Sequence, residues 1–225
     1  VGRTARKPCP MAHDFVDPYL DADASILRNL VGATNYDELL NAEGELVALR
    51  TNEFLEKLPL RPSGSMDDFL FIHRFLFQDI YDWAGMPRTV EIRKSQEGSE
   101  YFLPSPNIAM GFAWAQDELR KDNWLRDLPK EEFTQRLAYH FDNYNFIHPF
   151  REGNGRTQRL FWTLLCHEAG YDLDWCQVTG EENDEASRAA AEDMDLSGLV
   201  TIFTRIATPA DPNTPLNGDM LRLNK

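Results

Sequence analysis

Apolar residues that recur every three or four positions run through most of this chain, and this spacing restricts its fold more than any other feature. Such a pattern buries one face of an α-helix. The first such segment is residues 35–57, where Asn35 followed by Glu38 is typical of a helix start. Its expected stripe consists of Leu39, Leu46, Leu49 and Leu55. Further helices are expected over residues 67–84, 106–121, 130–146, 154–169, 181–194 and 196–207.

Residues 88–104 depart from this helical spacing. Residues 89–92 alternate like a β-strand, Gly98 indicates a turn, and residues 101–103 are a second short extended piece. We therefore expect a small β-hairpin here. The predicted fold class is mainly α, a helical bundle with one inserted hairpin.

The composition restricts the partners that the chain can bind. With 23 Lys and Arg against 37 Asp and Glu, the formal net charge is -14, so a broad basic face for nucleic acid is not expected. No run approaches the ~18 apolar residues of a membrane span, and the first residues lack the apolar stretch of a signal peptide. We therefore expect no direct contact with nucleic acid or membrane and a cytoplasmic site of action. Cys9, Cys166 and Cys176 have no metal-ligand spacing and are expected to be free thiols.

One segment, from His148 to Arg159, concentrates the residues that can do chemistry. It reads His-Pro-Phe-Arg-Glu-Gly-Asn-Gly-Arg-Thr-Gln-Arg and lies between two apolar stripes, so it joins two core helices. Gly153 and Gly155 allow backbone conformations closed to other residues, so successive N–H groups can turn toward one anion. The second helix starts at the same place, and a helix N-terminus offers unpaired N–H donors and the positive end of a dipole. The segment is therefore typical of a phosphate site.

Four side chains of this segment suit phosphate transfer. Arg156 and Arg159 can each bind phosphate oxygens through two donors. Two cations at the positive end of a helix are unfavourable unless an anion is present, so their position itself indicates a site. Glu152 is the only carboxylate of the segment and offers the oxygen ligand that Mg²⁺ prefers beside phosphates. His148, with an ordinary pKa of ~6.5, can take a proton from a hydroxyl at neutral pH.

Each of these features also has an ordinary structural interpretation. A histidine before proline is often a turn residue, Gly-Asn-Gly often connects a loop to a helix, and arginines often lie in solvent. A metal hydrolase with His148 and Glu152 as ligands is disfavoured, because such a site needs a further His or carboxylate at ligand spacing. The ordered combination of the residues favours a functional site.

Residues 148–159 resemble the signature of the Fic family (filamentation induced by cyclic AMP), His-Pro-Phe-x-Glu-Gly-Asn-Gly-Arg-x-x-Arg, at every defined position. The resemblance extends upstream to His73 and to Trp83-Ala84-Gly85, and downstream to about residue 207. It implies a helical bundle whose β-hairpin forms a flap over the catalytic loop.

The chain divides accordingly into three expected parts. Residues 1–34 would form an N-terminal extension with a first helix. The Fic domain would cover residues 35–207, with the flap at about 88–104. Residues 208–225 are rich in proline and are expected to form a loose tail.

The resemblance implies a protein adenylyltransferase, a nucleotidyltransferase that moves AMP from ATP to a Tyr, Thr or Ser hydroxyl of a target protein. His148 would be the general base for that hydroxyl, which attacks the α-phosphorus while pyrophosphate leaves. Glu152 would hold Mg²⁺ between the α- and β-phosphates.

The remaining implied roles concern the phosphates and the target. Arg156 would contact the β-phosphate and Arg159 the γ-phosphate. The flap would hold the target segment by β-strand addition, with Phe102 as the contact. Core packing is the alternative role of Phe102. The anion hole would consist of Gly153, Asn154 and Gly155.

Other functions of the same fold stay open. Some Fic proteins transfer UMP or phosphocholine or remove AMP, and a chain of this fold can also serve as a catalytically silent interaction module. Small bacterial members tend to modify type II topoisomerase subunits, so such a subunit is the expected target. The chain would then act as a toxin in the bacterial cytosol, or as an effector in a host cytosol.

Many Fic proteins carry an inhibitory helix with Ser or Thr, three residues, Glu, and then Gly or Asn. No Glu followed by Gly or Asn in this sequence has Ser or Thr four positions earlier. We therefore expect a separate small helical antitoxin that supplies an inhibitory Glu toward Arg159. An inhibitory helix outside the 225 residues is the alternative.

Overall fold

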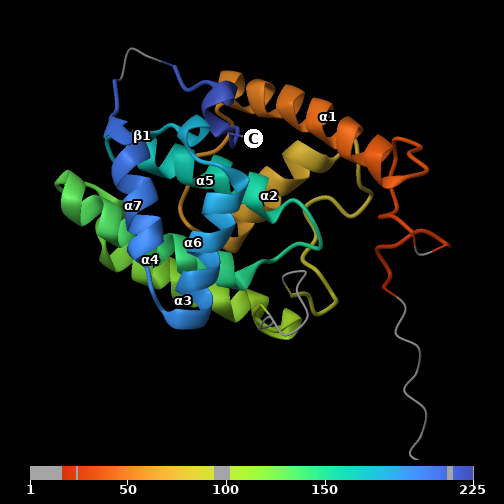
Figure 1. Ribbon diagram of the computed structural model, residues 1–225, viewed down its shortest axis with the longest axis horizontal. Coiled ribbons are helices and arrows are strands. Elements are labelled where there is room, and N and C mark those ends of the chain that lie inside the picture. Colours follow the sequence, from red (N-terminus) through yellow and green to blue (C-terminus); the bar gives the residue numbers. More distant parts are fainter. Residues whose placement is uncertain (1–16, 24, 94–101, 212–214, 225) are drawn as a thin grey trace, which may run out of the picture.

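Helix α5 (Asn154–Glu168) lies at the centre of the fold, and most of its residues, polar ones included, are buried. The computed structural model describes residues 17–23, 25–93, 102–211 and 215–224. Helix α2 packs directly on α5, with α1 on one side of this pair and α3 and α4 on the other, while α6 and α7 pack on each other and on α4 (Figure 1). The bounds are α1 Tyr36–Lys57, α2 Met66–Phe77, α3 Ile108–Lys121, α4 Lys130–Ile147, α6 Gly180–Asp193 and α7 Ser197–Ile206.

The mainly α class is confirmed, and most helices have the predicted bounds within one or two residues. The Asn35 side chain caps α1 by accepting the Glu38 N–H at 3.0 Å, as its position indicated. Helix α2 starts with a capping box between Ser65 and Asp68, and it ends at Phe77 rather than near residue 84. The expected length of α2 was wrong because residues 78–85 form turns, which still keep Ile80 and Trp83 in the core.

The stripe predicted for α1 is also wrong in part. Leu49 is 63% exposed, whereas Glu43 is only 5% exposed and faces the core together with Leu39 and Val47. A carboxylate therefore lies on the inner face of α1, where it needs a partner.

The strand predicted at residues 89–92 is wrong, because these residues form a bend and an irregular segment. Residues 94–101 of the predicted hairpin, including Gly98, lie outside the described residues. The Phe102 N–H donates to the Ile92 carbonyl at 3.2 Å, which joins the two sides of this segment. The Leu103 N–H donates to the Phe146 carbonyl at 3.0 Å, so the segment is attached to the end of α4.

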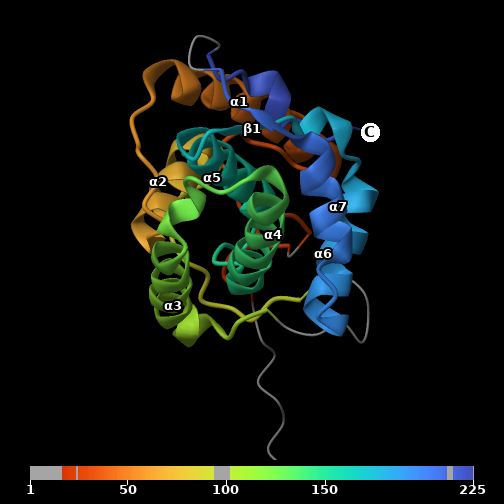
Figure 2. The ribbon, with the colours of Figure 1, turned by 90° about the vertical axis from the view of Figure 1, so that its left-hand side faces the viewer.

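The expectation of a loose tail is wrong for its described part. After α7 the chain forms β2 (Ala207–Pro209), which pairs antiparallel with β1 (Tyr171–Leu173). The 3-10 turn η4 (Gly218–Leu221) then lies against α1 and α5, and Figure 2 shows this end of the chain beside α1. Burial of Leu221, 8% exposed, holds the segment in place although prolines precede it.

At the other end, residues 17–23 and 25–34 form turns and one isolated bridge between Leu20 and Leu27, with no helix, while residues 1–16 lie outside the description. No helix of the described residues is both long and apolar enough to cross a membrane.

Candidate active site

The segment from His148 to Arg159 lies where α4 ends and α5 begins, as the sequence predicted. His148 is the C-cap of α4 and has a left-handed backbone with φ of 44°. Its ring stacks on Phe102 with the ring centroids 3.7 Å apart and the planes 9° from parallel. The base of the flap therefore lies directly over the histidine.

The hydrogen bonding of the His148 ring determines which nitrogen can act as a base. Nδ1 lies 3.2 Å from the Asn145 carbonyl oxygen, which can only accept a hydrogen bond. The neutral ring therefore carries its proton on Nδ1 and a lone pair on Nε2. Nε2 is the atom that can take a proton from a substrate hydroxyl.

Arg88 connects the flap to this loop from inside the protein. Its side chain is fully buried, and Nε donates to the His148 carbonyl at 2.8 Å. Nη1 donates to the Val90 carbonyl at 2.8 Å, and Nη2 donates to the Leu103 carbonyl. One guanidinium thus binds carbonyls on both sides of the flap base and on the catalytic loop.

His73 supports the loop from below. It is fully buried, stacks on Phe150 at a centroid distance of 3.8 Å, and accepts the Gly85 N–H on Nδ1 at 2.8 Å. Its Nε2 lies 3.0 Å from the Glu152 carbonyl oxygen and is the donor of that bond. Burial, together with the charge of Arg156, lowers the pKa of His73 to about 3, so the ring stays neutral.

Gly153 and Asn154 give the loop its shape. Gly153 has φ of 83°, and a Cβ there would lie 2.5 Å from Cζ of Phe77, so only glycine fits. The Asn154 side chain accepts the Phe150 N–H at 2.9 Å and donates to the Phe150 carbonyl at 2.8 Å. The side chain of Asn154 therefore holds the loop closed. In an anion hole, only the backbone N–H of Asn154 would contact the anion.

Arg156 lies among two carboxylates and a ring. Nη1 forms an ion pair with Glu43 at 2.8 Å, and Nη2 forms one with Glu152 at 3.1 Å. The guanidinium carbon lies 4.7 Å from the centre of the Phe77 ring. The hydroxyl of Tyr81 donates to the second oxygen of Glu43.

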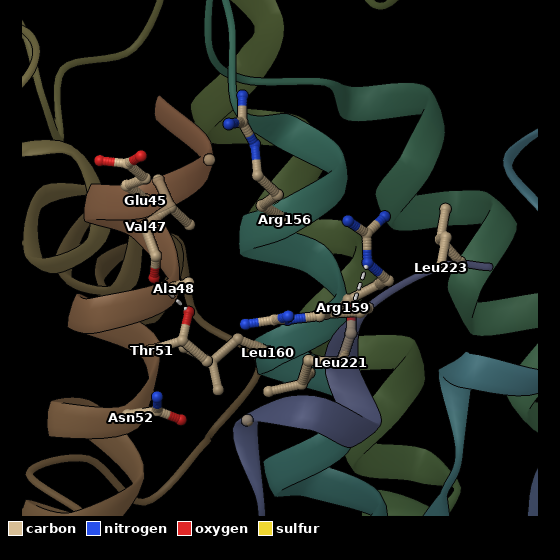
Figure 3. A pocket seen from close by; sticks show the side chains of 13 residues that line it. Glu45, Val47, Ala48, Thr51, Asn52, Arg156, Arg159, Leu160, Leu221 and Leu223 are labelled. Carbon is tan, nitrogen blue, oxygen red and sulfur yellow. Dashed lines mark hydrogen bonds between the residues drawn. The ribbon is translucent and has the colours of Figure 1, made fainter. Parts of the chain in front are cut away.

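Arg159 lies between two cavities. One, of about 530 Å³, is lined by Glu152, Gly153 and Gly155, and the other, of about 610 Å³, by α1 and the C-terminal segment. Figure 3 shows the second cavity, with Arg159 Nε donating to the Leu221 carbonyl at 3.2 Å. Burial and then the charge of Arg156 lower the pKa of Arg159 to about 10. An anion between the two arginines would raise the pKa of Arg159 again, because a negative charge favours the protonated guanidinium.

A metal ion at this site would need oxygen ligands from a bound substrate in addition to those of the protein. Among the described residues, no group of three or more His, Cys, Asp or Glu side chains could hold a metal. The Glu152 side chain is 44% exposed at the rim of the smaller cavity, where one carboxylate and substrate phosphates together suit Mg²⁺.

Three further side chains of this site lie outside the motif and were not predicted from it, namely Arg88, Glu43 and Tyr81. The signal for Glu43 is its spacing, because it lies four residues from both Leu39 and Val47 on the inner face of α1. No local pattern indicates Arg88 or Tyr81, since their contacts come from segments distant in sequence.

Comparison with known proteins now identifies the family. A family model described as Fic/DOC matches residues 63–166. The chain is 36% identical over 195 residues to the Probable protein adenylyltransferase Fic of Escherichia coli, a match that covers 86% of this chain and 94% of that protein. The chain belongs to the Fic/DOC family. The resemblance noted in the sequence is therefore confirmed.

Two further similar proteins extend the comparison. The chain is 35% identical over 176 residues to Protein adenylyltransferase VbhT of Bartonella schoenbuchensis, which covers 78% of this chain but only 35% of VbhT. The chain thus spans about a third of VbhT. The N-terminal Fic domain of a VirB-translocated Bep effector from Bartonella quintana, solved with bound ADP, matches with a TM-score of 0.78 at 26% identity over 85% of this chain and 95% of that one. The Fic-type bundle is therefore confirmed as the fold.

Proposed function

We propose that this chain is a protein adenylyltransferase that transfers AMP from ATP to a hydroxyl group of a protein. The observation that carries the proposal is the assembly at one helix junction of a histidine with its lone pair on Nε2, a glycine-shaped helix start and two arginines. The names of the Escherichia coli and Bartonella schoenbuchensis relatives, and the ADP bound to the Bartonella quintana domain, support a nucleotide substrate.

In the proposed reaction Nε2 of His148 takes the proton of the attacking hydroxyl. The hydroxyl oxygen bonds to the α-phosphorus, the bond from that phosphorus to the bridging oxygen breaks, and pyrophosphate leaves with the electron pair. The Asn145 carbonyl accepts a hydrogen bond from Nδ1–H, and this bond stabilises the imidazolium that forms.

The phosphates would lie at the start of α5, where backbone N–H groups and the helix dipole favour anions. Arg156 would bind the β-phosphate and Arg159 the γ-phosphate. Mg²⁺ bound by Glu152 would screen charge between the α- and β-phosphates. Glu152 Oε1 accepts the Gly153 N–H and Arg156 Nη2 at 2.8 and 3.1 Å, so Oε2 is the oxygen that would hold the ion.

The target would pair with the flap, so that its hydroxyl comes close to His148. Phe102 is placed for this contact because its ring covers the His148 ring. We propose a Tyr, Thr or Ser hydroxyl of an intracellular protein, with a type II topoisomerase subunit as the first candidate. This activity would suit either a bacterial toxin or an effector that acts in a host cytosol.

We also propose that a small helical antitoxin supplies a Glu to Arg159. The cavity of about 610 Å³ beside Arg159, between α1 and the C-terminal segment, is where such a carboxylate would arrive. Co-purification of a small chain from the native operon would support this partner. Recovery of the chain alone, fully active, would contradict it.

Incubation of a lysate with the protein, Mg²⁺ and ATP labelled on the α-phosphate tests the activity. We expect labelled protein with the wild type and none with His148→Ala, because that variant loses the base but keeps the phosphate site. His148→Ala should bind ATP with nearly the wild-type affinity. Label from the γ-phosphate instead of the α-phosphate, or near-normal labelling by His148→Ala, would contradict the proposed reaction.

A further inference from the structure

Glu43 is a buried carboxylate that the signature of the catalytic loop does not include. It lies on α1, far from the loop in sequence, and only 5% of the residue is exposed. One of its oxygens pairs with Arg156 Nη1 at 2.8 Å, and the other accepts the Tyr81 hydroxyl. Both carboxylate oxygens are therefore used inside the protein.

The two carboxylates that contact Arg156 differ in exposure. The side chain of Glu43 is 7% exposed, whereas that of Glu152 is 44% exposed. Separating Glu43 from Arg156 would leave a buried charge with only one hydrogen bond, which is costly. Glu152 can turn into water at little cost, so it is the exchangeable partner.

The geometry points to Glu43 as a positioning residue that holds Arg156 in place for the nucleotide. This inference rests on the proposed function, in which Arg156 binds the β-phosphate. Nη1 stays with Glu43 and the guanidinium stays over Phe77, while Nη2 leaves Glu152 and binds the phosphate. Arginine has five donors, so one side chain can keep both contacts.

Tyr81 completes this arrangement. Burial and the nearby Glu43 carboxylate raise the pKa of Tyr81 well above its ordinary value, so its hydroxyl keeps its proton and remains a donor. By binding one oxygen of Glu43, it leaves the other oxygen directed at Arg156. An arginine fixed in advance loses less conformational entropy when the nucleotide binds.

The opposite role would be competition, in which Glu43 takes Arg156 away from the phosphates. The two roles predict changes of opposite sign. If Glu43 positions Arg156, its loss weakens binding of nucleotides that have a β-phosphate. If Glu43 competes, its loss strengthens that binding.

Titration of the full chain with ATP, ADP and AMP, without a protein substrate, separates the two roles. For Glu43→Gln we expect affinity for ATP and ADP to fall about tenfold, or ~1.4 kcal/mol, with affinity for AMP nearly unchanged. Tyr81→Phe should show a smaller loss of the same kind. The matched control is Glu56→Gln, an exposed carboxylate near the other end of α1, which should leave all three affinities unchanged.

Each outcome decides for or against the inference. Equal or tighter binding of ATP by Glu43→Gln would overturn it, and so would an equal loss for ATP and AMP, which indicates general damage to the fold. If thermal unfolding shows that Glu43→Gln is not folded, the same comparison is made with Tyr81→Phe, and its result decides. A wild type that binds ATP but labels no protein would contradict the proposed function and leave this comparison intact.

Discussion

Gly153 shows how closely one residue is restricted at this site. Its φ of 83° disfavours any side chain, and a Cβ would overlap the Phe77 ring at 2.5 Å. Gly170, with φ of 95° and no atom within 4 Å of its missing Cβ, has the same backbone restriction without the overlap. Substitutions at these two glycines therefore distinguish the cost of backbone strain alone from the added cost of a steric overlap.

We expect Gly170→Ala to cost roughly 1 kcal/mol of unfolding free energy and Gly153→Ala roughly 1–3 kcal/mol more. Only Gly153→Ala should also weaken ATP binding, because the start of α5 must shift to relieve the overlap. Urea denaturation and an ATP titration of both variants measure these effects. Equal losses of stability would show that Phe77 moves aside and that the overlap does not matter.

Among the structural elements, the flap and the catalytic loop depend on Arg88. A lysine keeps the charge but presents its donors at one point, so it cannot reach carbonyls in three segments at once. We expect Arg88→Lys to lower kcat for AMP transfer at least tenfold, while the affinity for ATP changes little. The reason is that His148 and the flap lose their common support, whereas the start of α5 keeps its contacts.

The matched control for Arg88→Lys is Arg126→Lys, which changes an exposed ion pair with Glu168. Exposed pairs contribute little, so this variant should behave as the wild type. Steady-state rates with a model target protein, measured with an ATP titration, give both quantities. A loss of ATP affinity as large as the loss of kcat would contradict the assigned role.

Helices were predictable because periodicity and caps are local properties of the sequence. Asn35 indicated the start of the first helix, and the structure has its side chain as the N-cap there. The packing of the C-terminal segment was not predictable, since Leu221 is held by α1 and α5 and not by its neighbours in sequence. The inner face of α1 was misjudged because a buried Glu43 interrupts its apolar stripe.

At the scale of the whole molecule, the site combines one contiguous motif with supports from distant segments. The motif was visible in the sequence because the residues that can bind phosphate are neighbours. The contacts of the supports were not, because His73 and Arg88 reach the loop only after the chain has folded. A local signature thus indicates the chemistry, and the fold determines the geometry.

The same supports make global stability depend on pH. His73 has a pKa of about 3 in the folded chain and ~6.5 when unfolded, so the unfolded chain binds the extra proton between these values. Stability from His73 is complete above about pH 6.5 and falls by about 1.4 kcal/mol per unit below it. Asp142 acts in the opposite direction, because burial raises its pKa to about 6 and the folded chain then binds the extra proton.

His73→Gln isolates the first effect from the second. Glutamine can donate to the Glu152 carbonyl but does not titrate, while Asp142 is common to both proteins and cancels in the difference. Urea unfolding from about pH 8 to about pH 5 should give a constant difference in unfolding free energy above about pH 6.5. Below it, the wild type should lose about 1.4 kcal/mol per pH unit relative to the variant. A difference that does not change with pH would show that His73 takes up a proton inside the folded protein.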